Sequence, residues 1–212
     1  MRALIYVPVV HSEVDLGTMA DELRPRFQEV FGADEWVRRF ASVETMWECL
    51  RTMLCGLPID WPSTRLYQDG LPVCNQEREI VRDLAAKRSR NHQLLVELMA
   101  RGATLMGTER PDLLVREYRR IQRLVAASHE PAPEALVEEL RREGEAILRE
   151  RDGFIAHRLA ATLQDGETGI VFLGLLHRVD ELLDRSFEVR HLIHSLPFGA
   201  APWRQRRERT RP

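Results

Sequence analysis

The chain has 212 residues, of which 44% are hydrophobic and 30% are charged, and its formal net charge is -2. These values are typical of a globular protein with its own core, and the near-neutral charge argues against a nucleic-acid or anionic-membrane partner. No apolar stretch is long enough to span a bilayer, and the N-terminus lacks the pattern of a signal peptide. We therefore expect a cytoplasmic protein.

The first half of the chain predicts two strands that end next to polar side chains. An apolar run over residues 3–10 predicts a buried strand that ends at His11. Helices are expected over residues 17–30 and 34–54. Residues 64–68 alternate enough to predict a short strand, and Asp69 follows in a turn.

The second half is expected to be mainly helical. Residues 75–100 predict one long helical region, or two helices joined near residues 89–91, and residues 103–106 predict a brief strand or a packed connection. Thr108 is a candidate N-cap, with Pro111 in the first turn, for a helix that reaches residue 127. The remaining predicted segments are a long helix over 134–163, a final strand over 187–196 and a basic, disordered tail over 200–212. We thus expect a single domain over residues 1–199.

The run over residues 170–173 repeats the pattern of the first strand. It is short and apolar, Gly169 and Gly174 bound it, and His177 and a predicted helix from residue 179 follow it. Ligands of open α/β sheets bind beyond the carboxyl ends of the strands. If the two strands are neighbours, His11 and His177 meet at this edge of the sheet.

Arg151 occupies an unusual place in the predicted helix over residues 134–163. At about 100° per residue it falls at the centre of the apolar face that includes Leu140, Ile147 and Ile155, whereas Glu150 and Asp152 point elsewhere. A guanidinium in such a place requires an anion, unless it extends along its own stem to water. A bound anionic ligand is one candidate partner. The candidate partners from the chain are Glu13, Asp15 and Asp69.

Two histidines and a carboxylate at one edge are compatible with two kinds of chemistry. They could bind zinc or manganese and leave open positions for water, or act as general acid and base without a metal. Motifs for a nucleophilic serine, a phosphate loop or a dinucleotide are absent from the sequence.

The segment Glu150-Arg151-Asp152, followed by Phe154-Ile155-Ala156 and the run that ends in Gly174-Leu175-Leu176-His177, resembles the carboxyl half of the TraB/GumN/TIKI group. That group belongs to a superfamily with erythromycin esterase and the haem-binding ChaN lipoproteins. Its pattern there is Glu-Arg-Asn, Met-Ala and a strand ending in Gly-x-x-His. Its first strand ends in another Gly-x-x-His, and a carboxylate ends the next strand.

Gly174, His177 and Arg151 match the second half of this pattern directly. His11 matches the first motif's histidine, although Pro8 stands where the family has glycine. Asp69 stands for the strand-end carboxylate, which is usually glutamate, and Asp152 replaces the asparagine of Glu-Arg-Asn.

The resemblance implies an α/β fold with a mixed β-sheet flanked by several long helices. It also implies a metal-dependent hydrolase for a small-molecule or peptide-like substrate. His11 and His177 would bind a divalent metal ion, zinc or manganese, or move protons, and Asp69, or else Glu13, would complete the site. Arg151 would hold an anionic substrate group or orient the carboxylate, with Gly174 and Glu13 beside the substrate. Two alternatives remain: a non-catalytic module for a small anionic ligand, and a homo-oligomeric assembly protein built on the long helices.

Overall fold

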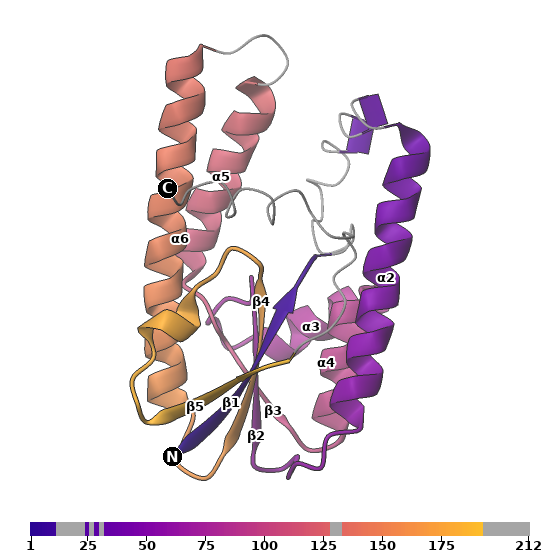
Figure 1. Cartoon of the computed structure of the whole chain (residues 1–212), viewed down its shortest axis with the longest axis vertical. Coiled ribbons are helices and arrows are strands. Elements are labelled where there is room, and N and C mark those ends of the chain that lie inside the picture. Colours follow the sequence, from indigo (N-terminus) through magenta and orange to yellow (C-terminus); the bar gives the residue numbers. More distant parts are fainter. Residues whose placement is uncertain (12–23, 26–27, 30–31, 128–132, 193–212) are drawn as a thin grey trace, which may run out of the picture.

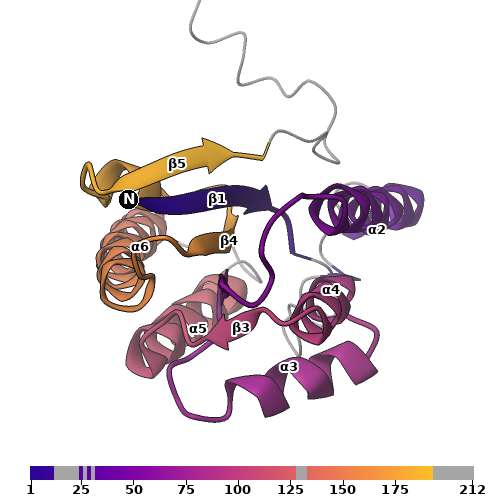
Figure 2. The same cartoon turned by 90° about the horizontal axis from the view of Figure 1, so that it is seen from below.

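The computed structural model describes residues 1–11, 24–25, 28–29, 32–127 and 133–192. Over these residues the chain forms a five-stranded sheet between two layers of helices (Figures 1 and 2). Most of the helix expected over 17–30, together with Glu13 and Asp15, lies outside the described residues. The tail expected over 200–212 and the last four residues of the strand expected over 187–196 also lie outside them.

The sheet confirms the expected α/β class but is entirely parallel, where a mixed sheet was expected. Its strands are β1 (Arg2–Val9), β2 (Thr64–Gln68), β3 (Thr104–Met106), β4 (Thr168–Gly174) and β5 (Phe187–His191). They lie in the order β3-β2-β4-β1-β5, and every neighbouring pair is parallel. The reason is that crossovers, rather than hairpin turns, join successive strands. Even the short link from β4 to β5 contains a 3-10 helix, η2 (Val179–Leu182), where a longer helix was expected.

The helices cover both faces of the sheet. One face is covered by α2 (Ala33–Cys55), α3 (Glu77–Ala86) and α4 (Arg90–Ala100) (Figure 2). The other is covered by α5 (Pro111–Ala127) and α6 (Glu134–Thr162) (Figure 2). Because successive strand residues point to opposite faces, β1 contributes Val7 and Val9 to the first core and Leu4 and Tyr6 to the second. This explains why the strands are almost continuously apolar.

The predicted helices are largely confirmed, with one correction at a helix start. The region over 75–100 divides into α3 and α4, and Arg88, at φ 69°, lies between them. Thr108 is not an N-cap, because α5 begins only at Pro111. Its hydroxyl instead accepts a hydrogen bond from the N–H of Gln68 and donates one to the carbonyl of Met106. Thr108 therefore ties the end of β2 to the end of β3.

The long helices extend beyond the carboxyl edge of the sheet. The α5–α6 pair rises on one side of this edge, and α2 rises on the other (Figure 1). Among the described helices, none combines the length and the apolar character needed to cross a membrane.

Candidate functional site

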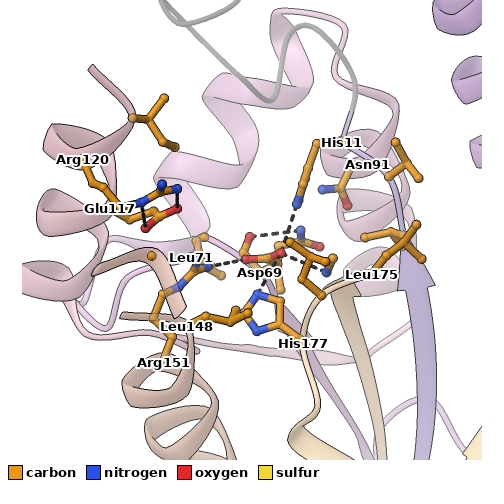
Figure 3. Close-up of a pocket in the computed structure, with 18 of the residues that line it drawn as sticks. His11, Asp69, Leu71, Asn91, Glu117, Arg120, Leu148, Arg151, Leu175 and His177 are labelled. Atoms are coloured by element: carbon orange, nitrogen blue, oxygen red, sulfur yellow. Dashed lines mark hydrogen bonds and ion pairs between the residues drawn. The ribbon is translucent and has the colours of Figure 1, made fainter. Parts of the chain in front are cut away.

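The expected meeting of the two histidines is confirmed at the carboxyl edge of the three central strands. Because β1, β4 and β2 are parallel neighbours, His11, His177 and Asp69 follow strands that end side by side. Nε2 of His11 lies 3.0 Å from Oδ2 of Asp69, and Nε2 of His177 lies 3.4 Å from the same oxygen (Figure 3). Asp69 is therefore the centre of the site, with only 7% of its side chain exposed.

The main chain of Gly174 lies so close to Asp69 that a side chain at this position would require the carboxylate to shift by a few tenths of an ångström. Its N–H donates a 2.9 Å hydrogen bond to Oδ2 of Asp69. A Cβ atom at this position would lie 3.0 Å from that oxygen and 3.7 Å from Nε2 of His11. Burial would raise the pKa of Asp69, but the hydrogen bonds of His11 and His177 hold it well below its usual value. Asp69 is thus a carboxylate at neutral pH.

Pro8, the departure from the family pattern, fits its place in the sheet. It pairs with Leu173 of β4 but lies two residues beyond Tyr6, which forms the last pair of β1 with β5. A residue without an N–H is tolerated where pairing on one side of a strand has ended.

Arg151 is buried and paired, so the extension to water considered for it does not occur. Its side chain is 12% exposed. Nε and Nη2 each donate a 2.6 Å hydrogen bond to Glu109, and Nη2 donates a further 2.7 Å bond to Oδ1 of Asp69. The expected partner Asp69 is confirmed, and Glu109 is the second partner (Figure 3 shows Arg151 and Asp69).

Glu109 is a site residue that the sequence reading missed. Its side chain is fully buried, and Oε1 also accepts a 2.8 Å hydrogen bond from the N–H of Gly70. Burial raises the pKa of Glu109, whereas the hydrogen bonds of Arg151 lower it. Glu109 could have been identified from its position just beyond β3, at the same edge of the sheet as Asp69. The prediction that Thr108 begins a helix instead placed Glu109 in the first turn of that helix.

Asp152 is the second residue that was missed. It was expected to point elsewhere than Arg151, but it is buried against His177, which itself lies next to Asp69, the partner of Arg151. Oδ1 lies 2.5 Å from Nδ1 of His177, and Oδ2 accepts a 3.0 Å hydrogen bond from the N–H of Arg178. Burial would lower the pKa of His177, but the hydrogen bonds of Asp152 and Asp69 raise it to about 9.

This raised pKa predicts a pH-dependent stability for the chelator-treated protein. An unfolded histidine has a pKa of about 6.5, so the stabilisation is complete below that pH and is lost as the pH rises through 9. The shift corresponds to a loss of about 3 kcal/mol in the free energy of unfolding. Urea unfolding between pH 6 and 10 measures it. His177→Gln should remove this slope and His157→Gln, at an exposed position of α6, should keep it; equal slopes in both variants would refute the assignment.

The donor atoms of this edge could hold a metal ion. Atoms of Asp69, Glu109 and His177 lie within 4.8 Å of one another. Glu109, however, already binds Arg151 through both oxygens, which leaves it poorly placed as a ligand. The expected set of His11, His177 and Asp69 does not form a mutually close group of this kind among the described residues, although each histidine lies near Oδ2 of Asp69. The two Nε2–Oδ2 distances of 3.0 and 3.4 Å suit neighbouring ligands with bonds of about 2 Å.

A cavity of about 700 Å³ opens above these residues. Its floor contains His11, Asp69, Arg151 and His177, and its walls come from α3 to α6 and the loop after β4. The apolar part of the lining is formed by Val9, Val10, Leu71, Ile80, Leu84, Ile121, Leu148, Leu175 and Leu176. The arrangement provides a charged floor under a largely apolar chamber, which is the usual form of a small-molecule site.

Comparison with known proteins adds no further assignment. The sequence matches no family model, and no curated protein or solved structure matches it significantly.

Proposed function

We propose that the chain is a hydrolase of the TraB/erythromycin-esterase-like type that acts on a small molecule in this cavity. The observation that supports the proposal most directly is the convergence of both Nε2 atoms on one carboxylate oxygen of Asp69, at the floor of the cavity. Beside one buried carboxylate, the imidazole of His11 can accept the proton of an attacking water and the protonated ring of His177 can donate one to the leaving group.

In this proposal each side chain has a distinct role. His11, with 30% of its side chain exposed, faces the cavity and takes the proton from water. Asp152 fixes the orientation of His177, and Arg151 with the N–H of Gly174 holds Asp69 in place. The Nη1 group of Arg151 has no hydrogen bond to any described residue, so it can donate to a carbonyl oxygen of the substrate as negative charge develops on that oxygen during hydrolysis.

We propose that a divalent ion can also take part at this edge of the sheet, where Asp69 and His177 belong to a group of side chains close enough to hold one. Zinc or manganese held by His11, His177 and Asp69 would polarise a carbonyl group and lower the pKa of water. Because His177 is protonated at neutral pH in the metal-free protein, the ion would replace this proton, so the charge of the site would change by only one unit.

The alternative of a non-catalytic anion-binding module has less support. Arg151 already meets two carboxylates through Nε and Nη2, so the site needs no bound anion to compensate its charge. Three carboxylates, those of Asp69, Glu109 and Asp152, surround this guanidinium and His177. The local charge therefore favours a neutral substrate or a cation over an anion.

The test is a hydrolase screen combined with elemental analysis. Chelator-treated wild type is incubated with zinc, with manganese or with neither, and assayed on ester, lactone and amide substrates beside a His11→Ala/His177→Ala double variant. We expect turnover in the wild type, loss of about 10²-fold or more in the double variant, and unchanged turnover in His157→Gln. Folded wild type without turnover under every condition would refute a hydrolase of these substrates. Metal retained by the double variant would refute the ligand set.

A further inference from the structure

Two buried carboxamide side chains at the cavity have no partner for part of their hydrogen-bonding capacity. Gln68 and Asn91 are each 1% exposed, and both contribute to the lining of the cavity. Oε1 of Gln68 and both Oδ1 and Nδ2 of Asn91 form no hydrogen bond with any described residue. Buried polar atoms in proteins are nearly always paired, so three unpaired atoms beside one cavity require an explanation.

The two side chains lie on the same side of the cavity. Gln68 is the last residue of β2 and points to the same face as Leu66, which packs in the core under α2 to α4. Asn91 belongs to the first turn of α4, and Figure 3 shows it beside His11. Gln68 directly precedes Asp69, and its Nε2 donates to the carbonyl of Asp69, so this amide lies next to the charged floor of the cavity that both carboxamides line.

The unpaired atoms determine the chemistry of a matching ligand. Nε2 of Gln68 donates to the carbonyl of Asp69, so the orientation of this amide is fixed and Oε1 is a free acceptor. Asn91 offers one acceptor and one donor whichever way its amide is turned. A group that presents a donor and an acceptor on one edge satisfies Asn91, and a further N–H satisfies Gln68. A primary carboxamide has both, and a lactam has the donor–acceptor edge.

We propose that Asn91 and Gln68 form a subsite for an uncharged carboxamide or lactam edge of the substrate, separate from the bond that is hydrolysed. The apolar walls from Ile80, Leu84 and Leu175 would enclose the hydrocarbon part of such a molecule. The inference extends the proposed function by naming a substrate class for the same cavity. It concerns binding alone, so it can fail or hold independently of turnover.

The experiment compares three six- or seven-carbon probes of similar shape: hexanamide, 2-heptanone and hexanoate. Dissociation constants are measured by ligand-observed NMR titration on the wild type, Asn91→Leu, Gln68→Leu and Gln93→Leu. Gln93 is the matched control, since it is a carboxamide on the same helix that does not line the cavity. We expect the wild type and Gln93→Leu to bind hexanamide about tenfold more tightly than 2-heptanone, and both cavity variants to lose this preference.

Thermal unfolding separates binding from a structural role. If the carboxamide of Asn91 binds a ligand, it has no hydrogen-bond partner in the ligand-free protein. Replacing it by an apolar side chain in Asn91→Leu then removes no hydrogen bond, so Tm should stay unchanged or rise by about 2–4 °C. A lower Tm, or failure of Asn91→Leu to fold, would show that the amide has a partner within the protein and would overturn the inference. Equal binding of hexanamide and 2-heptanone by the wild type would also overturn the inference. Tighter binding of hexanoate than of hexanamide would overturn it as well and would indicate an anionic ligand.

Discussion

Arg151→Met is expected to lower the free energy of unfolding by about 3–5 kcal/mol. Glu109 is fully buried and Asp69 is 7% exposed, and both depend on this guanidinium for neutralisation. Methionine keeps much of the apolar stem of arginine. It removes the guanidinium, however, so the two carboxylates are left close together without a positive charge between them. Urea unfolding at pH 7 measures the loss.

Two further variants test this explanation. Arg116→Met removes an arginine of α5 whose partner Glu150 is almost half exposed, so its loss should stay below about 1 kcal/mol. Adding Glu109→Gln to Arg151→Met removes one unpaired charge and should recover at least about 1 kcal/mol relative to the sum of the single changes. An additive double variant would show that Arg151 stabilises the fold by packing alone.

Asp152→Asn is expected to reduce kcat/KM by about 10²- to 10⁴-fold while the protein stays folded. In the wild type the carboxylate accepts a hydrogen bond from Nδ1 of His177, which leaves Nε2 directed at Asp69. An asparagine cannot stabilise the positive charge of this ring, and when it donates to Nδ1 the one remaining proton resides on Nε2. The ring keeps its position, but the metal-free site loses its imidazolium, and a bound metal ion would lose the Nε2 lone pair that it requires.

The chain provides a matched control for this prediction. Asp180 and His191 form a second carboxylate–imidazole pair, 3.2 Å apart, on the surface. Asp180→Asn should leave kcat/KM within about twofold, because exposed pairs contribute little. Equal losses in the two variants would show that charge in general, and not the orientation of His177, controls the rate. Recovery of activity in Asp152→Glu would support orientation.

The site residues that could be predicted from the sequence are those whose local sequence pattern determines their position in the fold. His11, Asp69 and His177 each follow a recognisable strand, and parallel strands bring their carboxyl ends to one edge. Arg151 was identified because a charge at the centre of an apolar helical face requires a partner, and the structure provides one.

The residues that were missed lack such a local signal. β3 has only three residues, so the strand end that places Glu109 is hardly visible in the sequence. Asp152 follows Arg151 directly, and the helical wheel turns it away from the apolar face that was considered. Its burial depends on the loop after β4, which no helical periodicity describes. The mixed sheet was expected from the resemblance alone, and the crossover to β5, with only four residues of 3-10 helix, provides little sequence signal for a parallel strand.

The strand order has a consequence for biosynthesis. β1 is synthesised long before both of its neighbours in the sheet, β4 and β5, which come from residues 168–191. Until they emerge, both edges of β1 lack their final partners, and such a strand is prone to wrong pairing. The nascent chain should therefore stay protease-sensitive until β4 has emerged, and a ribosome-bound fragment ending near residue 160 should engage chaperones that the finished chain does not need. The site around Asp69 is therefore complete only after His177 has been synthesised.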